Sequence, residues 1–127
     1  MKQIKDGSKE LFIVNDKDGT PTYTHDFAKT VKELIKKEYW GLYNCVCGGQ
    51  TSRFEVADEL VTLLGMQDEI KITSVSSDYF KDIYYAERPP SERLLTKKLD
   101  LRGVNKMRDW RISLKEYIEN YYQGYLD

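Results

Sequence analysis

The sequence has little of what marks a metal-bound, nucleic-acid-binding or membrane-spanning protein. It holds one histidine in 127 residues, and 20 basic side chains nearly cancel 21 acidic ones. This balance gives no general electrostatic attraction to nucleic acid or anionic lipid. The purely apolar runs are far shorter than the roughly 20 residues that span a bilayer. We therefore expect no nucleic-acid and no membrane partner.

An export signal and a metal-ligand set are also missing. The start, MKQIKDGSKE, lacks the apolar stretch of a signal peptide, so a soluble cytoplasmic protein is expected. Cys45 and Cys47 lie two positions apart in a predicted strand. Both side chains would therefore point to one face about 7 Å apart, which disfavours a local disulfide. With one distant histidine they fall short of a structural zinc set. Reduced cysteines and no bound metal are expected.

No standard catalytic motif is present. The sequence contains no G-x-x-x-x-G-K-[ST], no G-x-S-x-G and no H-E-x-x-H, and a Ser-His-Asp arrangement would have only His25 to use. Nothing in the sequence arranges a nucleophile or general base around His25. We assign no catalytic residue, and we expect His25 to be an exposed polar residue in the first turn of a helix.

The apolar periodicity predicts a small α/β (α+β-like) domain that covers residues 1–127. Strands are predicted at 10–16, 39–47 and 69–76, and helices after Pro21, at 52–64, at 96–102 and from Asp109 onward. The first strand is apolar throughout, which indicates burial on both faces as in a parallel sheet. The pattern indicates about three short, mainly parallel strands with three main helices.

Several helix ends are readable. Ser52 and Glu55 form an S-x-x-E capping box, and Gly65 suits the left-handed position after the last turn. Asp109 is predicted to cap the last helix. In the segment TYTHD, Thr24 can cap the helix, and Asp26 favours the positive end of the helix dipole.

Three residues are candidates for binding. Thr22 and Tyr23 place a hydroxyl and a phenol at a helix start, where they could bind an anion or a sugar hydroxyl. Arg88 precedes two prolines that stiffen its loop, and a guanidinium suits two-point binding of phosphate. The alternative for Arg88 is a solvated side chain on a surface loop. The many tyrosines suggest a surface that meets a partner; they are Tyr84, Tyr85, Tyr117, Tyr121, Tyr122 and Tyr125.

Taken together, four blocks resemble the C-terminal part of the dTDP-4-dehydrorhamnose reductases, which are extended short-chain dehydrogenase/reductases. The blocks are VNDKDGTPTYTHDFA, GLYNCVCGGQTSRFEVA, ERPPSERLLTKKLDLRGV and DWRISLKEYI. They occur in the family's order and span residues 10 to 118. The sequence differs from the family pattern at Lys17, where the family has glutamine, and at Ser91–Leu95, where it has N-S-x-L followed by aspartate.

The resemblance implies a substrate-binding domain of a Rossmann-type reductase, with the cofactor domain absent. Such enzymes use NADH or NADPH to reduce dTDP-4-dehydrorhamnose. Arg88 corresponds to a residue that faces the diphosphate, and Thr22 and Tyr23 would lie near the junction with the cofactor domain. The family's glycine-rich cofactor turn is missing, and no tyrosine is followed by lysine four positions later. We therefore expect no cofactor site and no hydride transfer in this chain.

The partners follow from the same resemblance. A dTDP-sugar nucleotide is the expected ligand, and the missing Rossmann half is the expected neighbour. Without that half, Phe27 and its neighbours should expose apolar surface and favour self-association. The alternative is a non-catalytic interaction module, because the same family includes regulatory subunits that bind other enzymes.

Overall fold

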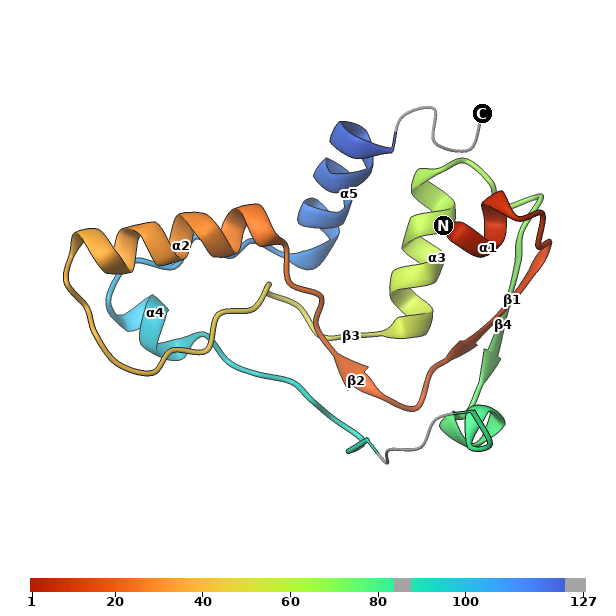
Figure 1. Ribbon diagram of the computed structural model, residues 1–127, viewed down its shortest axis with the longest axis horizontal. Coiled ribbons are helices and arrows are strands. Elements are labelled where there is room, and N and C mark those ends of the chain that lie inside the picture. The colour runs from red at the N-terminus through yellow and green to blue at the C-terminus, as the bar shows by residue number, and fades with distance from the viewer. Residues whose placement is uncertain (84–87, 123–127) are drawn as a thin grey trace.

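A computed structural model gives the fold and describes residues 1–83 and 88–122 (Figure 1). The helices are α1 Lys2–Lys5, α2 Thr24–Lys36, α3 Arg53–Leu63, the 3-10 helix η1 Ser77–Phe80, α4 Lys97–Leu101 and α5 Trp110–Tyr121. The strands are β1 Glu10–Val14, β2 Asp18–Gly19, β3 Thr51–Ser52 and β4 Lys71–Val75. The predicted mixed α/β class is confirmed, and α2, α3 and α5 are the three main helices.

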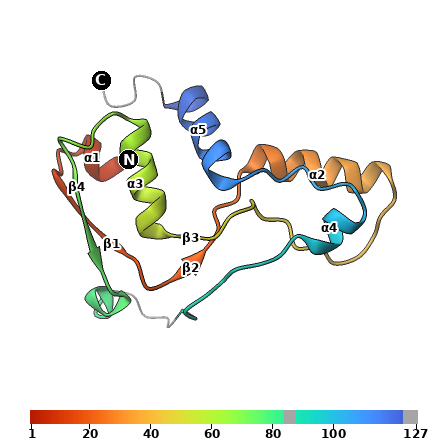
Figure 2. The ribbon, with the colours of Figure 1, turned by 180° about the vertical axis from the view of Figure 1, so that it is seen from behind.

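Two short sheets organise the chain. β1 pairs in parallel with β4, from Glu10 opposite Lys71 to Val14 opposite Val75. β2 and β3 form a two-residue antiparallel ladder. Helix α3 packs against β1 and β4 and also contacts α5 (Figure 2). The carboxyl end of the parallel pair therefore leads directly into the loops around β2 and η1.

The first hydrophobic cluster lies between α3 and the parallel strands. Its buried members are Ile4, Leu11, Val61 and Ile70. The prediction that the first strand is buried on both faces was wrong, because Phe12 is 41% exposed on the opposite face. There its ring stacks on Tyr79, with the centroids 5.4 Å apart.

A second hydrophobic cluster joins the starts of α2 and α5. It consists of Tyr23, Cys47 and Trp110, with Val56 of α3 among the partly buried side chains packed against it. Cys45 and Cys47 are both free thiols, as expected. Burial raises the pKa of the Cys45 thiol above its usual range. Helix α3 thus takes part in both clusters, through Val61 in the first and Val56 in the second.

The strand predicted at 39–47 is wrong. Residues 42–47 form no strand, and no backbone N–H or C=O of residues 41–47 bonds to the backbone of another described residue. Side chains hold the segment instead: the Lys98 Nζ donates to the Leu42 carbonyl at 3.0 Å, and the Asn44 Nδ2 donates to the Leu95 carbonyl at 3.3 Å. Residues 41–47 have the apolar alternation of a strand, but no described strand lies beside them to complete the backbone hydrogen bonds.

Most predicted helix ends are confirmed. The capping box of Ser52 and Glu55 has both of its hydrogen bonds, Gly65 has a φ of +68°, and the Asp109 carboxylate accepts from the Arg111 N–H. The predicted cap at Thr24 was wrong. Tyr23 occupies the cap position without a side-chain hydrogen bond, and Thr24 is the first helical residue.

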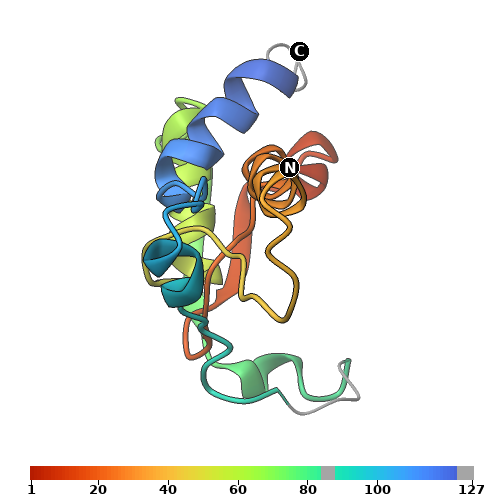
Figure 3. The same ribbon diagram turned by 90° about the vertical axis from the view of Figure 1, so that its left-hand side faces the viewer.

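One end of the molecule projects away from the parallel strands. Helices α2 and α4 lie at this end, and α3, α1, β1 and β4 lie at the other (Figure 1). Figure 3 looks onto the end that carries α2 and α4. On α2, Phe27 is 43% exposed and Ile35 is 57% exposed, so part of its apolar face meets solvent. Among the helices of the described residues, none combines the length and apolar character needed to cross a bilayer.

Candidate functional site

A groove of about 1090 Å³ opens at the carboxyl end of β1. Its walls come from the β1–β2 connection, the start of α3, η1 and the loop that begins at Arg88. Loops at the carboxyl ends of parallel strands are the usual position of ligand sites in α/β folds. This groove is therefore the first candidate for a binding site.

Two polar residues after β1 accept hydrogen bonds that fix one side of the groove. The Asp16 carboxylate accepts from the Ser77 N–H at 2.9 and 3.0 Å and from the Ser77 hydroxyl at 2.9 Å. These bonds, led by the one from the Ser77 backbone, hold the pKa of Asp16 below its usual range. The Ser52 hydroxyl donates to Asn15 at 2.7 Å. The start of η1 and the start of α3 are thereby both tied to the end of β1.

The proline-containing loop forms the other side. Its backbone runs beside β2: the Asp18 N–H donates to the Pro90 carbonyl at 2.8 Å, and the Glu92 N–H donates to the Asp18 carbonyl at 2.9 Å. The Lys17 ammonium donates to the Arg88 carbonyl at 2.8 Å. Three bonds thus fix the backbone on which the Arg88 guanidinium is carried.

The groove carries mixed charge with a small positive excess. Four basic and three acidic residues line it: Lys17, Arg53, Lys81 and Arg88 against Asp18, Asp78 and Glu92. The Arg88 guanidinium pairs with Glu92 at 3.2 Å, and its side chain remains 63% exposed. An exposed pair of this kind contributes roughly 0–1 kcal/mol, so a phosphate can replace Glu92 at low cost. The arrangement suits an anionic ligand.

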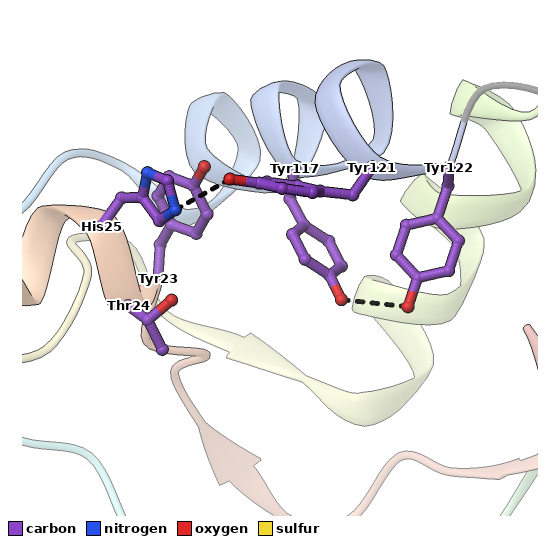
Figure 4. A pocket seen from close by; sticks show the side chains of 6 residues that line it. All are labelled: Tyr23, Thr24, His25, Tyr117, Tyr121 and Tyr122. Carbon is purple, nitrogen blue, oxygen red and sulfur yellow. Dashed lines mark hydrogen bonds between the residues drawn. The ribbon is translucent and has the colours of Figure 1, made fainter.

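A second pocket, of about 490 Å³ and called the aromatic pocket below, lies between the start of α2 and the end of α5 (Figure 4). Its lining shares no residue with the groove. The lining residues are Tyr23, Thr24, His25, Tyr117, Tyr121 and Tyr122. The His25 Nε2 and the Tyr121 hydroxyl lie 2.9 Å apart, and the Tyr117 hydroxyl lies 3.0 Å from that of Tyr122.

A partly buried ionic network adjoins this pocket through Tyr23. The Asp26 carboxylate, 1% exposed, accepts from Nε of Arg108 at 2.8 Å and from its Nη2 at 2.9 Å. Arg108 also pairs with Glu116, which accepts from the Tyr23 phenol at 3.2 Å. Burial alone would raise the pKa of Asp26, but the bonds from Arg108 and Ser113 outweigh it and hold the pKa below its usual range.

The same network shifts its other members. The bonds to Asp26 and Glu116 raise the pKa of Arg108, and the bond from Arg108 lowers the pKa of Glu116. Burial, together with the bond to Glu116, raises the pKa of the Tyr23 phenol. The arginine is thus permanently charged, and the phenol keeps its proton at neutral pH.

The family model described as "RmlD substrate binding domain" matches residues 1–123. This chain belongs to that family. The similarity expected from the four sequence blocks is confirmed, and the chain corresponds to the C-terminal part of the reductase fold.

Relatives of this RmlD substrate-binding domain include one curated protein and two solved structures. The spore coat polysaccharide biosynthesis protein SpsK of Bacillus subtilis is 29% identical over 119 residues, which cover 94% of this chain and 40% of SpsK. A dTDP-4-dehydrorhamnose reductase structure from Clostridium acetobutylicum has a TM-score of 0.85 at 33% identity and covers 93% of this chain. The Bacillus anthracis reductase, solved in complex with NADP, has a TM-score of 0.80 at 26% identity and covers 94% of this chain.

The RmlD substrate-binding domain is shorter than these relatives. It spans 41% of the Clostridium acetobutylicum chain and 41% of the Bacillus anthracis chain. The domain therefore spans less than half the length of each of these two reductases.

The predicted binding residues of this RmlD domain lie in different places. Arg88 lines the groove. Tyr23 is buried, and its ring lines the aromatic pocket. Thr22 is exposed and lines neither cavity. Arg88 and Tyr23 thus line different cavities. The binding roles of all three residues stay predictions.

Sequence reasoning missed the residues that organise both cavities. Arg108 carried no local signal, because its partner Asp26 lies 82 positions away. Asp16 and Lys17 did carry one: polar residues directly after a buried strand are typical of the ligand edge of a parallel sheet. Of the predicted tyrosine surface, Tyr117, Tyr121 and Tyr122 line the aromatic pocket, whereas Tyr84, Tyr85 and Tyr125 lie outside the described residues.

Proposed function

We propose that residues 1–127 form the single sugar-nucleotide-binding domain of an NAD(P)H-dependent dTDP-4-dehydrorhamnose reductase. The groove at the carboxyl end of β1 is its binding site for a dTDP-sugar. One observation carries the proposal: a guanidinium on an anchored loop faces a large groove, in a chain that belongs to the RmlD substrate-binding domain family.

The groove residues have distinct roles in this proposal. Arg88 exchanges Glu92 for the diphosphate, to which it offers two parallel N–H donors. Lys17 holds the Arg88 backbone at 2.8 Å and positions the guanidinium for that exchange. Thr22 and Tyr23, which follow the β2 segment, contribute to the junction with the cofactor-binding part.

The reaction needs groups that this chain does not supply. In a complete reductase, bound NADPH or NADH would supply the hydride for reduction of the 4-keto group of the sugar, and a proton would complete the hydroxyl group of dTDP-rhamnose. The glycine-rich cofactor turn and the Y-x-x-x-K motif of the family are missing from the sequence. Residues 1–127 bind and orient the sugar nucleotide, and the rest of the reductase fold performs the transfer.

Titration calorimetry of the 127-residue chain tests this function. We expect measurable heat of binding with dTDP-rhamnose and none with NADPH. The substitution Arg88→Ala should weaken dTDP-rhamnose binding about tenfold or more, because a charge-assisted hydrogen bond is worth about 1.5–3 kcal/mol.

A matched control comes from the same loop. Arg93 is exposed and does not line the groove, so Arg93→Ala should leave the affinity for dTDP-rhamnose unchanged. If both substitutions weakened dTDP-rhamnose binding equally, the effect of Arg88 would come from the net charge of the chain and not from a direct contact. Absence of dTDP-rhamnose binding in the unsubstituted chain would contradict the function itself.

A second candidate function is a non-catalytic interaction module. The observation that favours it is the exposure of large apolar side chains on the α2–α4 end, among them Trp40, Leu42 and Leu95. Such side chains usually meet another protein surface. Under this alternative, the chain forms a stable complex with a partner enzyme whether or not Arg88 is present.

A further inference from the structure

The second arginine of the groove, Arg53, has no role in the function proposed above. It lines the groove and is the first residue of α3. Within residues 1–83 and 88–122, its guanidinium makes no hydrogen bond and no ion pair. The other groove arginine, Arg88, already pairs with Glu92. Arg53 is therefore a cation of the groove whose charge is balanced by no described protein group.

Hydrogen bonds fix the backbone from which Arg53 extends. The buried Ser52 caps α3: its hydroxyl accepts from the Glu55 N–H at 3.2 Å, and its own N–H donates to the Glu55 carboxylate at 2.9 Å. The same hydroxyl donates to Asn15 at 2.7 Å. The start of α3 is thereby tied to the end of β1, and the Arg53 side chain begins at a fixed point, as that of Arg88 does.

Arg53 and Arg88 approach the groove from opposite edges of β2. Asp18 of β2 pairs with Ser52 in the antiparallel ladder and forms a parallel bridge with Ser91. Paired strands lie about 4.8 Å apart, so the backbones of Ser52 and Ser91 are roughly 10 Å apart across β2. Arg53 directly follows the first of these residues, and Arg88 precedes the second in the proline-containing loop. The two arginines can therefore contact one ligand from two sides.

The surroundings of Arg53 favour an anionic ligand. The Asp18 carboxylate accepts from the Gln50 side chain at 3.1 Å, and the Glu92 carboxylate pairs with Arg88. No carboxylate of the described residues pairs with Arg53. A guanidinium presents two parallel N–H donors that match the oxygens of one phosphate group. Two arginines at the described groove therefore match a ligand with two phosphate groups.

We infer that Arg53 binds one phosphate of the sugar nucleotide while Arg88 binds the other, so that the groove selects a nucleoside diphosphate over a monophosphate. This inference rests on the proposed function, because that function supplies the diphosphate ligand. Arg88 exchanges Glu92 for its phosphate, whereas Arg53 has no described ion pair to give up. The contact at Arg53 is thus gained without the loss of a protein contact.

Titration calorimetry of the 127-residue chain with dTDP and dTMP tests the inference. The unsubstituted chain should bind dTDP about tenfold more tightly than dTMP, because dTDP engages both arginines. Arg53→Ala and Arg88→Ala should each weaken dTDP binding about tenfold. Since dTMP has a single phosphate, its affinity should fall with only one of the two substitutions. Arg53→Lys keeps the charge and should restore part of the affinity for dTDP.

Arg93→Ala is the control for net charge, because Arg93 is exposed and lies outside the groove lining. It should leave the affinities for dTDP and dTMP unchanged. The Arg53 side chain has no described protein partner, so Arg53→Ala should also keep the urea midpoint of the unsubstituted chain.

The outcomes separate this inference from the proposed function. If Arg53→Ala leaves dTDP binding unchanged while Arg88→Ala weakens it, the role of Arg53 is overturned and the groove function stands. Equal weakening by Arg53→Ala and Arg93→Ala, or a dTMP affinity that falls with both groove substitutions, would overturn it as well. If the unsubstituted chain binds neither dTDP nor dTDP-rhamnose, both the inference and the proposed function fail.

Discussion

The carboxylate of Asp26 shows how much one residue at a helix start can control. Its position in the first turn of α2 predicted a favourable interaction with the helix dipole. In the folded chain it is also buried, bonded to Arg108 through two nitrogens and to Ser113 at 3.1 Å. The sequence signals the helix start, but it does not signal the partner, because the contact spans 82 positions.

Asp26→Asn is expected to destabilise the fold by about 2–3 kcal/mol. The substitution leaves Arg108 with Glu116 alone, and breaking a buried pair is costly, although partial exposure of the arginine reduces the loss. Urea unfolding at pH 7 measures the change. Glu119→Gln breaks an exposed pair with Lys115 on α5 and should cost less than about 0.5 kcal/mol. Equal effects would argue against the buried network.

Acid should weaken the same network. The pKa values of Asp26 and Glu116 are lower in the folded chain than in the unfolded one, so the unfolded chain binds more protons in acid. Their stabilisation is complete above the ordinary carboxyl range near pH 4 and is lost as the pH falls further through the folded values. Urea midpoints measured from pH 7 to pH 3 should fall. Asp26→Asn should flatten this decline, and a midpoint that rises in acid would contradict it.

At the scale of elements, the segment 41–47 explains where sequence reasoning failed. Helices α2, α3 and α5 were predictable because periodicity and caps are local signals. Strand pairing depends on residues that are distant in the sequence. β1 pairs with β4, but residues 41–47 have no strand partner within 1–83 and 88–122. A strand-like sequence without a partner remains an extended loop.

Hydrogen exchange should reveal that difference directly. We expect the amides of Leu42 to Val46 to exchange nearly as fast as in an unstructured peptide, because none donates to the backbone of another described residue. The amides of β1 that bond to β4 provide the internal control and should be protected. Equal protection of the two segments would show that 41–47 is paired in solution.

At the scale of the whole molecule, the exposed apolar face of α2 predicts self-association. Phe27 and Ile35 lie on one face of this helix, and both meet solvent. Light scattering at rising concentration should show an increasing mean mass, and the double substitution Phe27→Lys and Ile35→Lys should abolish the increase. Ile112→Lys on α5, at similar exposure, is the control. A constant monomer mass at high concentration would contradict the prediction.

The candidate site was only partly predictable at this scale. Arg88 could be identified because two prolines follow it. Its groove could not, because it forms only when the end of β1, the start of η1 and the proline loop meet across 61 and 71 positions. Tyr23 was identified as a polar group at a helix start, whereas the fold makes it a core residue beside Trp110.

The two hydrophobic clusters have a calorimetric consequence through α3. Because Val61 belongs to one cluster and Val56 packs against the other, loss of either cluster removes buried contacts from the same helix. Both should melt in one transition, with equal calorimetric and van't Hoff enthalpies. The heat-capacity increment should be roughly 1.5–1.9 kcal/mol/K for a chain of this length. Ser52→Ala, which removes the cap of α3, should lower that single melting temperature without splitting the peak.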